Sequence, residues 1–319
     1  MRELAERIVE TGEEAITLLR FVTFEGEGSP RLGLVAGDQV VDLNRADHSI
    51  PSDMLAFLAA GPNALNAAVH VHGLWKAGAL ASDAIRPRSG LRLLAPVRNP
   101  SKIVAVGVNY LDHCREAGIE PPEEPLLFAK FPSSIVGPGD LIEWDPALTA
   151  AVDYEAELAV VIGRESRNVS LADAYDVVFG YTCANDITAR DLQRRDGQWV
   201  RGKSLDTFCP LGPEIVSKDE VLTPGDLGIF CRVNGDVLQS SNTKGMIFDI
   251  PALIAFITRA FTLLPGDLIL TGTPHGTGAF RHPPILLRDG DVVDVEIERV
   301  GTLSNQCREI GPEHSGTKG

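Results

Sequence analysis

The amino-acid sequence predicts a β-rich α+β fold in which a small N-terminal α/β domain precedes a larger core. Before residue 90 short strand-like runs are followed by helix-like runs, whereas from Ser101 onward the apolar runs are longer and glycines lie at their corners. The chain of 319 residues is long enough for one large core with a smaller appendage. We therefore expect domains at residues 1–92 and 93–310 and a flexible tail at residues 311–319.

The expected N-terminal domain follows from the period of its apolar residues. Short strands are expected over residues 16–24, 31–35 and 39–43, which are bounded by turn-forming residues. From Ser52 to about Leu80 the apolar side chains recur at helical spacing, and Gly61-Pro62 separates two helices.

The expected core domain consists mainly of strands. They are expected over residues 102–106, 156–162, 227–233, 268–270 and 291–297, and a further strand begins near Val177. Asn234-Gly235 is typical of a two-residue hairpin turn, and one helix is expected over about 250–261. This pattern predicts a sheet-rich core whose strands pack around a central pocket.

Composition and charge exclude several classes of partner. The net charge of −15 argues against nucleic acid or an anionic membrane as the partner. Five cysteines without a C-x-x-C pair favour reduced thiols over a disulfide framework. The helix-prone N-terminus lacks the apolar run of a signal peptide, and no stretch approaches the roughly 20 apolar residues of a membrane span. We expect a soluble cytoplasmic protein.

Three carboxylates predict a metal site. Glu155 and Glu157 point to the same side of an otherwise apolar strand, where two like charges are costly without a cation between them. An exposed edge strand would explain this pair equally simply. Asp186, which follows the next apolar strand, adds a third carboxylate and favours a Mg²⁺ or Mn²⁺ site.

Further polar residues are candidates for catalysis and substrate binding. His113 and Glu116 are neighbours on a helix surface and could activate a water, although a solvated surface pair has the same spacing. The Pro-rich residues 118–125 that follow them would suit a mobile flap. Arg190, Gln193 and Lys203 could bind a carboxylate or a developing oxyanion.

The glycine-rich residues 271–278 follow an apolar strand. Their backbone amides and hydroxyls could closely approach an anionic ligand, and a plain turn is the alternative.

These segments together resemble the fumarylacetoacetate hydrolase family, in particular its prokaryotic-type acylpyruvase and 2-hydroxyhepta-2,4-diene-1,7-dioate isomerase branch. The resemblance extends over about residues 101–300. Seven segments carry it, in an order and spacing that are specific: 107–116, 128–134, 154–158, 185–193, 203–206, 233–235 and 270–274.

The resemblance implies a mixed β-sandwich roll, usually a homodimer, with Mg²⁺ bound by Glu155, Glu157 and Asp186. Mn²⁺ and Ca²⁺ would also suit three carboxylates. Animal fumarylacetoacetate hydrolases carry a further acidic ligand shortly before the histidine, whereas this chain has Gly107-Val-Asn-Tyr110 there. We therefore expect three protein ligands only.

The resemblance also implies roles for the other residues. His113, Glu116 and Lys203 are expected to be catalytic, with the first two forming a water-activating dyad on a lid. Three residues are expected to bind substrate: Arg190, Gln193 and Thr273. The expected partner is a small anionic 2-oxo acid, because the metal, Arg190 and Lys203 together outweigh the three carboxylates by one positive charge.

The expected reaction is hydrolysis of a C–C bond in an acylpyruvate or diketo acid through a metal-stabilised pyruvate enolate, as in aromatic or sugar-acid catabolism. The same core could serve a 2-hydroxyhepta-2,4-diene-1,7-dioate-type isomerase (tautomerase) or an oxaloacetate-type decarboxylase, because all three reactions pass through a similar enolate. A non-catalytic metal-binding homologue is a further alternative.

Overall fold

The computed structural model describes residues 18–311. The helix-prone N-terminus, the first two residues of the strand expected at 16–24 and the expected tail from residue 312 lie outside this range. The β-rich α+β class that the sequence predicts is confirmed, and the sheets are mixed because three of the strand pairs, β17–β6, β14–β8 and β19–β9, are parallel.

The N-terminal part is an antiparallel meander covered by helices. Its elements are β1 (Arg20–Glu25), β2 (Pro30–Ala36), β3 (Gln39–Asp42), α2 (Leu43–Ala46), α3 (Met54–Ala60), α4 (Pro62–Lys76), β4 (Ile85–Pro87) and β5 (Leu93–Leu94). The expected strand over 39–43 is one residue too long, because Asp42 caps α2 by accepting a hydrogen bond from the Arg45 N–H. Gly61 separates α3 from α4 as expected.

No single helix within residues 18–311 is long and apolar enough to cross a membrane. Helices α3 and α4, which are bent by 111° relative to one another, would together be long and apolar enough by length and composition alone.

The core is a sandwich of two sheets. The large sheet continues with β6 (Ile103–Gly107), β7 (Leu126–Lys130), β8 (Ile135–Val136), β11 (Ala156–Ile162), β12 (Val178–Asn185), β14 (Cys209–Ser217) and β17 (Leu268–Leu270). The second sheet contains β9 (Leu141–Trp144), β15 (Gly228–Val233), β16 (Asp236–Asn242), β18 (Val292–Ile297) and β19 (Gly301–Glu309). Apolar side chains from β11 and β12 pack against those of β15 and β18, and this layer forms the main core.

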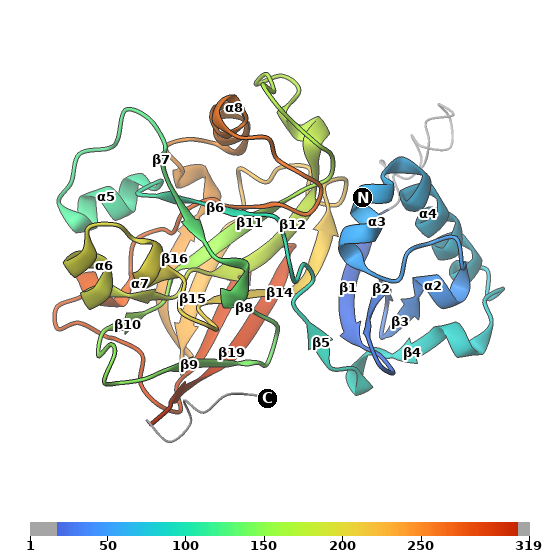
Figure 1. Ribbon diagram of the computed structural model, residues 1–319, viewed down its shortest axis with the longest axis horizontal. Coiled ribbons are helices and arrows are strands. Elements are labelled where there is room, and N and C mark those ends of the chain that lie inside the picture. The colour runs from blue at the N-terminus through green and yellow to red at the C-terminus, as the bar shows by residue number, and fades with distance from the viewer. Residues whose placement is uncertain (1–17, 312–319) are drawn as a thin grey trace.

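One sheet runs from the N-terminal strands into the core. Its strand order is β4-β3-β2-β1-β14-β12-β11-β17-β6-β7, and β1 pairs with β14 at Arg20↔Val216 and Phe21↔Ile215. Figure 1 shows the N-terminal part in blue beside the larger core. The boundary expected near residue 92 therefore stays a prediction, because the backbone pairing is continuous across the two parts.

Four helices and a short two-stranded sheet complete the core. They are α5 (Leu111–Ala117), α6 (Arg190–Asp196), α7 (Val200–Lys203), α8 (Ile250–Ala260), β10 (Val152–Asp153) and β13 (Thr188–Ala189). The helix expected over 250–261 is confirmed as α8. Helices α5, α6 and α7 gather at the end of the molecule remote from the N-terminal part (Figure 1), and they carry most of the polar residues singled out above.

Candidate active site

Strand pairing brings the three predicted metal ligands together. In the antiparallel pair β11–β12, Ala156 lies opposite Asn185, so Asp186 directly after β12 lies beside Glu155. The Asp186 N–H donates to the Glu155 carbonyl at 2.9 Å. Glu155, Glu157 and Asp186 are all buried, and one oxygen from each carboxylate lies within 4.8 Å of the others. The exposed edge-strand interpretation of the Glu-x-Glu pair is therefore wrong.

Two of these carboxylates are neutralised by buried cations. Lys203 Nζ donates to Glu155 at 2.7 Å and to Asp186 at 2.6 Å. Arg190 Nη2 lies 2.6 Å from the other Glu155 oxygen. Burial alone would raise the pKa of Glu155, but Lys203 and Arg190 outweigh it and lower the pKa to about 2.

The sequence reasoning missed the second buried lysine. Lys130 Nζ donates to the other Asp186 oxygen at 2.6 Å and to the Ile187 carbonyl at 3.3 Å. It also donates to the carbonyl of Lys203, so it holds the segment that carries the other lysine. The available signal was a single lysine directly after the apolar run Leu126–Ala129.

Glu157 is the carboxylate that no buried cation neutralises. The Gly272 N–H donates to one Glu157 oxygen at 2.7 Å, and within residues 18–311 no side-chain cation contacts Glu157. Burial, Asp186 and Glu155 raise its pKa well above the ordinary value. Once Glu157 is ionised the site carries one excess negative charge among oxygen ligands, which fits a hard divalent cation held by Glu155, Glu157 and Asp186.

The metal-free protein is expected to lose stability as pH rises above the ordinary carboxyl pKa. Because the pKa of Glu157 is raised from 4.5, the folded state keeps a proton that the unfolded chain releases. This contribution is fully present below pH 4.5 and is lost as pH rises through the folded-state pKa, by up to about 1.4 kcal/mol per pH unit. Urea unfolding of wild type and Glu157→Gln over this range measures it. Identical slopes in the two proteins would contradict the expectation.

The loop at 271–278 holds carboxylates of the protein itself, and its expected approach to an anionic ligand stays a prediction. Each bond joins one glycine N–H to one carboxylate: Gly272 to Glu157 at 2.7 Å, Gly276 to Glu116 at 2.9 Å and Gly278 to Asp153 at 2.7 Å. Gly272 has φ +95°, and a Cβ there would lie 2.8 Å from the Asn109 Cβ. The glycines therefore let the backbone of the loop approach these carboxylates closely, and the loop fixes the positions of Glu157, Glu116 and Asp153.

Helix α5 places His113 and Glu116 at the same cavity. His113 Nδ1 lies 3.2 Å from a Glu116 oxygen, and the His113 ring packs edge-on against Phe280 at 5.3 Å. His113 is only 7% exposed, so the interpretation as a solvated surface pair is wrong. Burial would raise the pKa of Glu116, but His113 and the Gly276 amide outweigh it and lower the pKa, so Glu116 is ionised.

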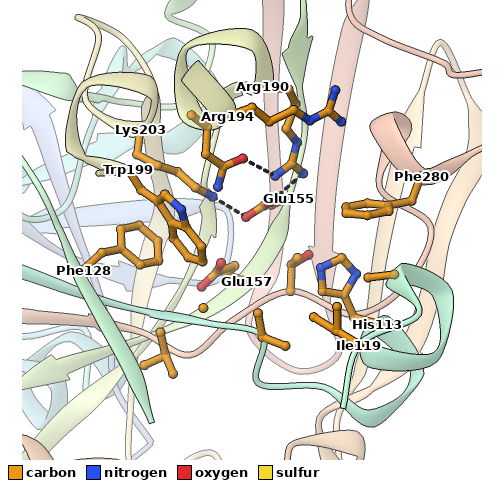
Figure 2. A pocket seen from close by; sticks show the side chains of 16 residues that line it. His113, Ile119, Phe128, Glu155, Glu157, Arg190, Arg194, Trp199, Lys203 and Phe280 are labelled. Carbon is orange, nitrogen blue, oxygen red and sulfur yellow. Dashed lines mark hydrogen bonds and ion pairs between the residues drawn. The ribbon is translucent and has the colours of Figure 1, made fainter. Parts of the chain in front are cut away.

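Arg190 and Gln193 lie on α6 and both line the cavity. Figure 2 shows Arg190 on the same side of the cavity as Lys203. Arg190 Nη1 donates to the side-chain amide oxygen Oε1 of Gln193 at 3.2 Å. Arg190 Nε donates to buried Asp153 at 2.8 Å. The sequence reasoning missed Asp153, although it precedes Glu155 and Glu157 in the same alternation.

Thr273 lines the cavity, but its hydroxyl already has partners. It donates to the Ala156 carbonyl at 3.0 Å and accepts from Gln239 Nε2 at 2.8 Å. A hydroxyl has one donor hydrogen, so a hydrogen bond from this hydroxyl to a substrate carboxylate would require Thr273 to release Ala156. Its substrate-binding role stays a prediction, as do those of Arg190 and Gln193.

One cavity of about 290 Å³ is lined by most of the residues described above. Polar groups lie at its floor, and its walls are largely aromatic and apolar, including Phe128, Trp199, Ile119 and Phe280 (Figure 2). Ile119 belongs to the segment expected to form a flap, which has no helix or strand over residues 118–125. The arrangement can bind a small anion beside a divalent cation, and His113 can exchange a proton with that anion.

Comparison with known proteins supports this description. The family model described as fumarylacetoacetate (FAA) hydrolase, C-terminal, matches residues 102–308. The Xenopus laevis protein named oxaloacetate tautomerase fahd2, mitochondrial, is 48% identical over 293 residues, which cover 90% of this chain and 89% of the relative. The likeness is therefore not confined to prokaryotic-type members.

Solved structures of similar proteins have the same fold. A fumarylacetoacetate hydrolase from Exiguobacterium antarcticum has a TM-score of 0.80 at 38% identity, covering 92% of this chain and 100% of that chain. The 2-hydroxyhepta-2,4-diene-1,7-dioate isomerase from Mycobacterium marinum has a TM-score of 0.71 at 35% identity, covering 91% and 98%. The maleylpyruvate hydrolase from Sphingobium sp. SYK-6, in complex with manganese(II) and pyruvate, has a TM-score of 0.74 at 32% identity, covering 91% and 99%.

Proposed function

The chain belongs to the fumarylacetoacetate hydrolase family, and on that premise we propose that it is a divalent-metal-dependent tautomerase of a small 2-oxo acid of the oxaloacetate type. The observation that carries the proposal is the buried carboxylate triad sharing one small cavity with the His113–Glu116 pair. The similarity to oxaloacetate tautomerases supports this alternative better than the C–C hydrolysis that the sequence reasoning placed first.

Tautomerisation requires one proton to leave the enol oxygen on carbon 2 and one proton to reach carbon 3. Because Glu116 is ionised, it accepts a hydrogen bond from His113 Nδ1–H, which leaves Nε2 as the basic atom of the ring. His113 lines the cavity, so Nε2 can take up the first proton and return one at carbon 3. No water is consumed and no C–C bond breaks.

The cations of the chain orient the substrate's carboxylate. Burial alone would lower the pKa of Lys203, but Asp186 and Glu155 outweigh it and raise the pKa, so the side chain stays charged. A bound divalent ion would act as a Lewis acid on the 2-oxo group. Counting it with Lys130, Lys203 and Arg190 against the triad and Asp153 leaves one positive charge, which one substrate carboxylate balances.

Cavity size supports a small substrate. At about 290 Å³ the cavity lies at the lower end of the range for small-molecule sites, so a four- or five-carbon acid suits it better than a long diketo acid. The aromatic wall formed by Phe128 and Trp199, whose ring centroids lie 5.3 Å apart, limits the space further. An acylpyruvate with a short acyl group falls within the same size limit, so cavity size argues only against long diketo acids.

Product analysis tests the proposal. Purified protein with Mg²⁺ is incubated with the enol form of oxaloacetate, an acylpyruvate and 2-hydroxyhepta-2,4-diene-1,7-dioate, and the products are identified by NMR. We expect rapid conversion of enol- to keto-oxaloacetate without loss of carbon dioxide. Cleavage of the acylpyruvate with the enol unchanged would favour the hydrolase instead. Three unchanged substrates would contradict catalysis of these reactions.

C–C hydrolysis remains the second candidate because of one specific observation. A His–Glu pair beside a metal site could equally direct a water at a carbonyl carbon, and a maleylpyruvate hydrolase has a similar structure. Decarboxylation uses the same groups and would appear in the same NMR assay as release of carbon dioxide from oxaloacetate.

We also propose Mg²⁺ as the metal, with Mn²⁺ and Ca²⁺ able to replace it, because the ligands are carboxylate oxygens. A structural relative binds manganese(II). That the protein is a cytoplasmic homodimer remains a proposal from the sequence. Light scattering of the purified protein would determine the oligomeric state.

A further inference from the structure

We propose that Arg194 forms an outer anion subsite that binds a second carboxylate of the substrate, so that the enzyme selects 2-oxo diacids over 2-oxo monoacids. This inference rests on the proposed function and adds to it the residue that sets specificity at the open end of the cavity. Arg194 lines the same cavity as Glu155, Glu157 and His113.

The inner cations of the cavity are already engaged. The three nitrogens of the Arg190 guanidinium lie within 3.2 Å of Asp153, Glu155 and Gln193. Lys203 is held between two carboxylates. These groups balance the metal site and one substrate carboxylate.

Arg194 differs from those cations. Among residues 18–311 it makes no ion pair and donates no side-chain hydrogen bond, although it is a cavity-lining residue. The acidic residue nearest in sequence, Asp196, is already paired with Arg201 at 2.6 Å and lies 3.6 Å from Arg195. The Arg194 guanidinium is therefore available to a ligand.

The helix places the two arginines at different depths. Arg190 and Arg194 are four residues apart on α6, so they share one face and are separated by about 6 Å along the axis. Arg190 is buried whereas Arg194 is exposed. A substrate anchored at its 2-oxo acid end beside Arg190 would extend outward past this face, and Figure 2 shows both arginines on the same side of the cavity.

A second carboxylate needs such a partner. The inner site supplies one positive charge in excess, which the first carboxylate uses, and the protein as a whole carries a net charge of −15. A second carboxylate drawn into an aromatic-walled cavity without a cation would be costly. A charge-assisted hydrogen bond from Arg194 offsets that cost.

Binding of matched ligand pairs tests the inference. The dissociation constants of 2-oxoglutarate and 2-oxopentanoate, which differ by a carboxylate in place of a methyl group, are measured by calorimetry on Mg²⁺-loaded protein. We expect Arg194→Gln to weaken 2-oxoglutarate binding about tenfold and to leave 2-oxopentanoate binding unchanged. In turnover of enol-oxaloacetate, the same variant should raise KM with little change in kcat.

Arg195→Gln is the matched control, because it removes the same charge from the adjacent position outside the cavity lining. It should leave both dissociation constants unchanged. Equal affinity of wild type and Arg194→Gln for the diacid, or equal losses in the two variants, would overturn the inference while the proposed function stands. If wild type binds neither acid but converts enol-oxaloacetate, the inference fails and the proposed function stands; if it also leaves enol-oxaloacetate unchanged, the proposed function fails.

Discussion

Glu157→Gln is expected to abolish binding of the divalent metal and, with it, turnover. With Glu157 ionised, as metal binding requires, the triad and Asp153 exceed Lys130, Lys203 and Arg190 by one negative charge, and the substitution removes that excess. A divalent ion would then enter a buried site with no net attraction for it. The loss of affinity should exceed the roughly 10- to 100-fold cost of losing an outer-shell partner.

Calorimetric titration with Mg²⁺ and paramagnetic resonance of Mn²⁺ measure this loss directly, without relying on activity. The matched control is Glu165→Gln, which removes the same charge from an exposed position. Because Gln is close in shape to Glu, the fold should persist, and circular dichroism would verify it. Full metal affinity in the Glu157 variant would show that the triad is not the metal site.

His113→Ala should separate catalysis from metal binding. The residue is not a member of the triad, so metal affinity should stay near the wild-type value, while turnover falls about 10²- to 10⁴-fold with the loss of the base. The measurements are Mn²⁺ binding and the rate of enol-oxaloacetate conversion. His70→Ala, an exposed histidine on α4, is the control and should retain activity.

Glu116→Gln tests whether the charge of Glu116 contributes to the work of the His113–Glu116 pair. The Gln side chain can still accept from His113 Nδ1–H, but it no longer stabilises a protonated ring by charge. A smaller fall in turnover than for His113→Ala is therefore expected. Wild-type turnover in His113→Ala would exclude the dyad from the reaction.

The metal ligands could be predicted from the sequence because strand geometry is local. Alternation alone places Glu155 and Glu157 on one side, and the end of the following strand supplies Asp186. The buried counter-charges could not be predicted in this way. Lys130 reaches Asp186 from a strand 56 residues earlier, and only the folded sheet shows that the two meet.

The strand β14 shows a second limit of local reasoning. Pro210, Gly212 and Pro213 argue against a strand, yet Cys209–Ser217 lies between β1 and β12. The register of β12 and β14 shifts between Tyr181 and Cys183, and Pro213 lies within the unpaired residues 213–215 of this irregularity. Tertiary pairing, which the sequence pattern does not reveal, outweighs the local preference.

The choice among reactions also lies beyond the residues themselves. A triad, a His–Glu pair and two cations serve tautomerisation, decarboxylation and hydrolysis alike, so the site residues predicted from the sequence are compatible with each. Similarity to oxaloacetate tautomerases favours the first. That similarity extends over 90% of the chain and does not depend on any one motif.

The pairing of β1 with β14 gives the N-terminal strands a protective role. Without β1, one side of β14 would present unpaired N–H and C=O groups at the edge of the sheet. An open edge of this kind recruits strands from other molecules. The small N-terminal part thus covers this edge, and it also shares a buried core cluster with Ala159, Leu211 and Leu268. A shortened protein lacking it is therefore expected both to aggregate and to lose stability.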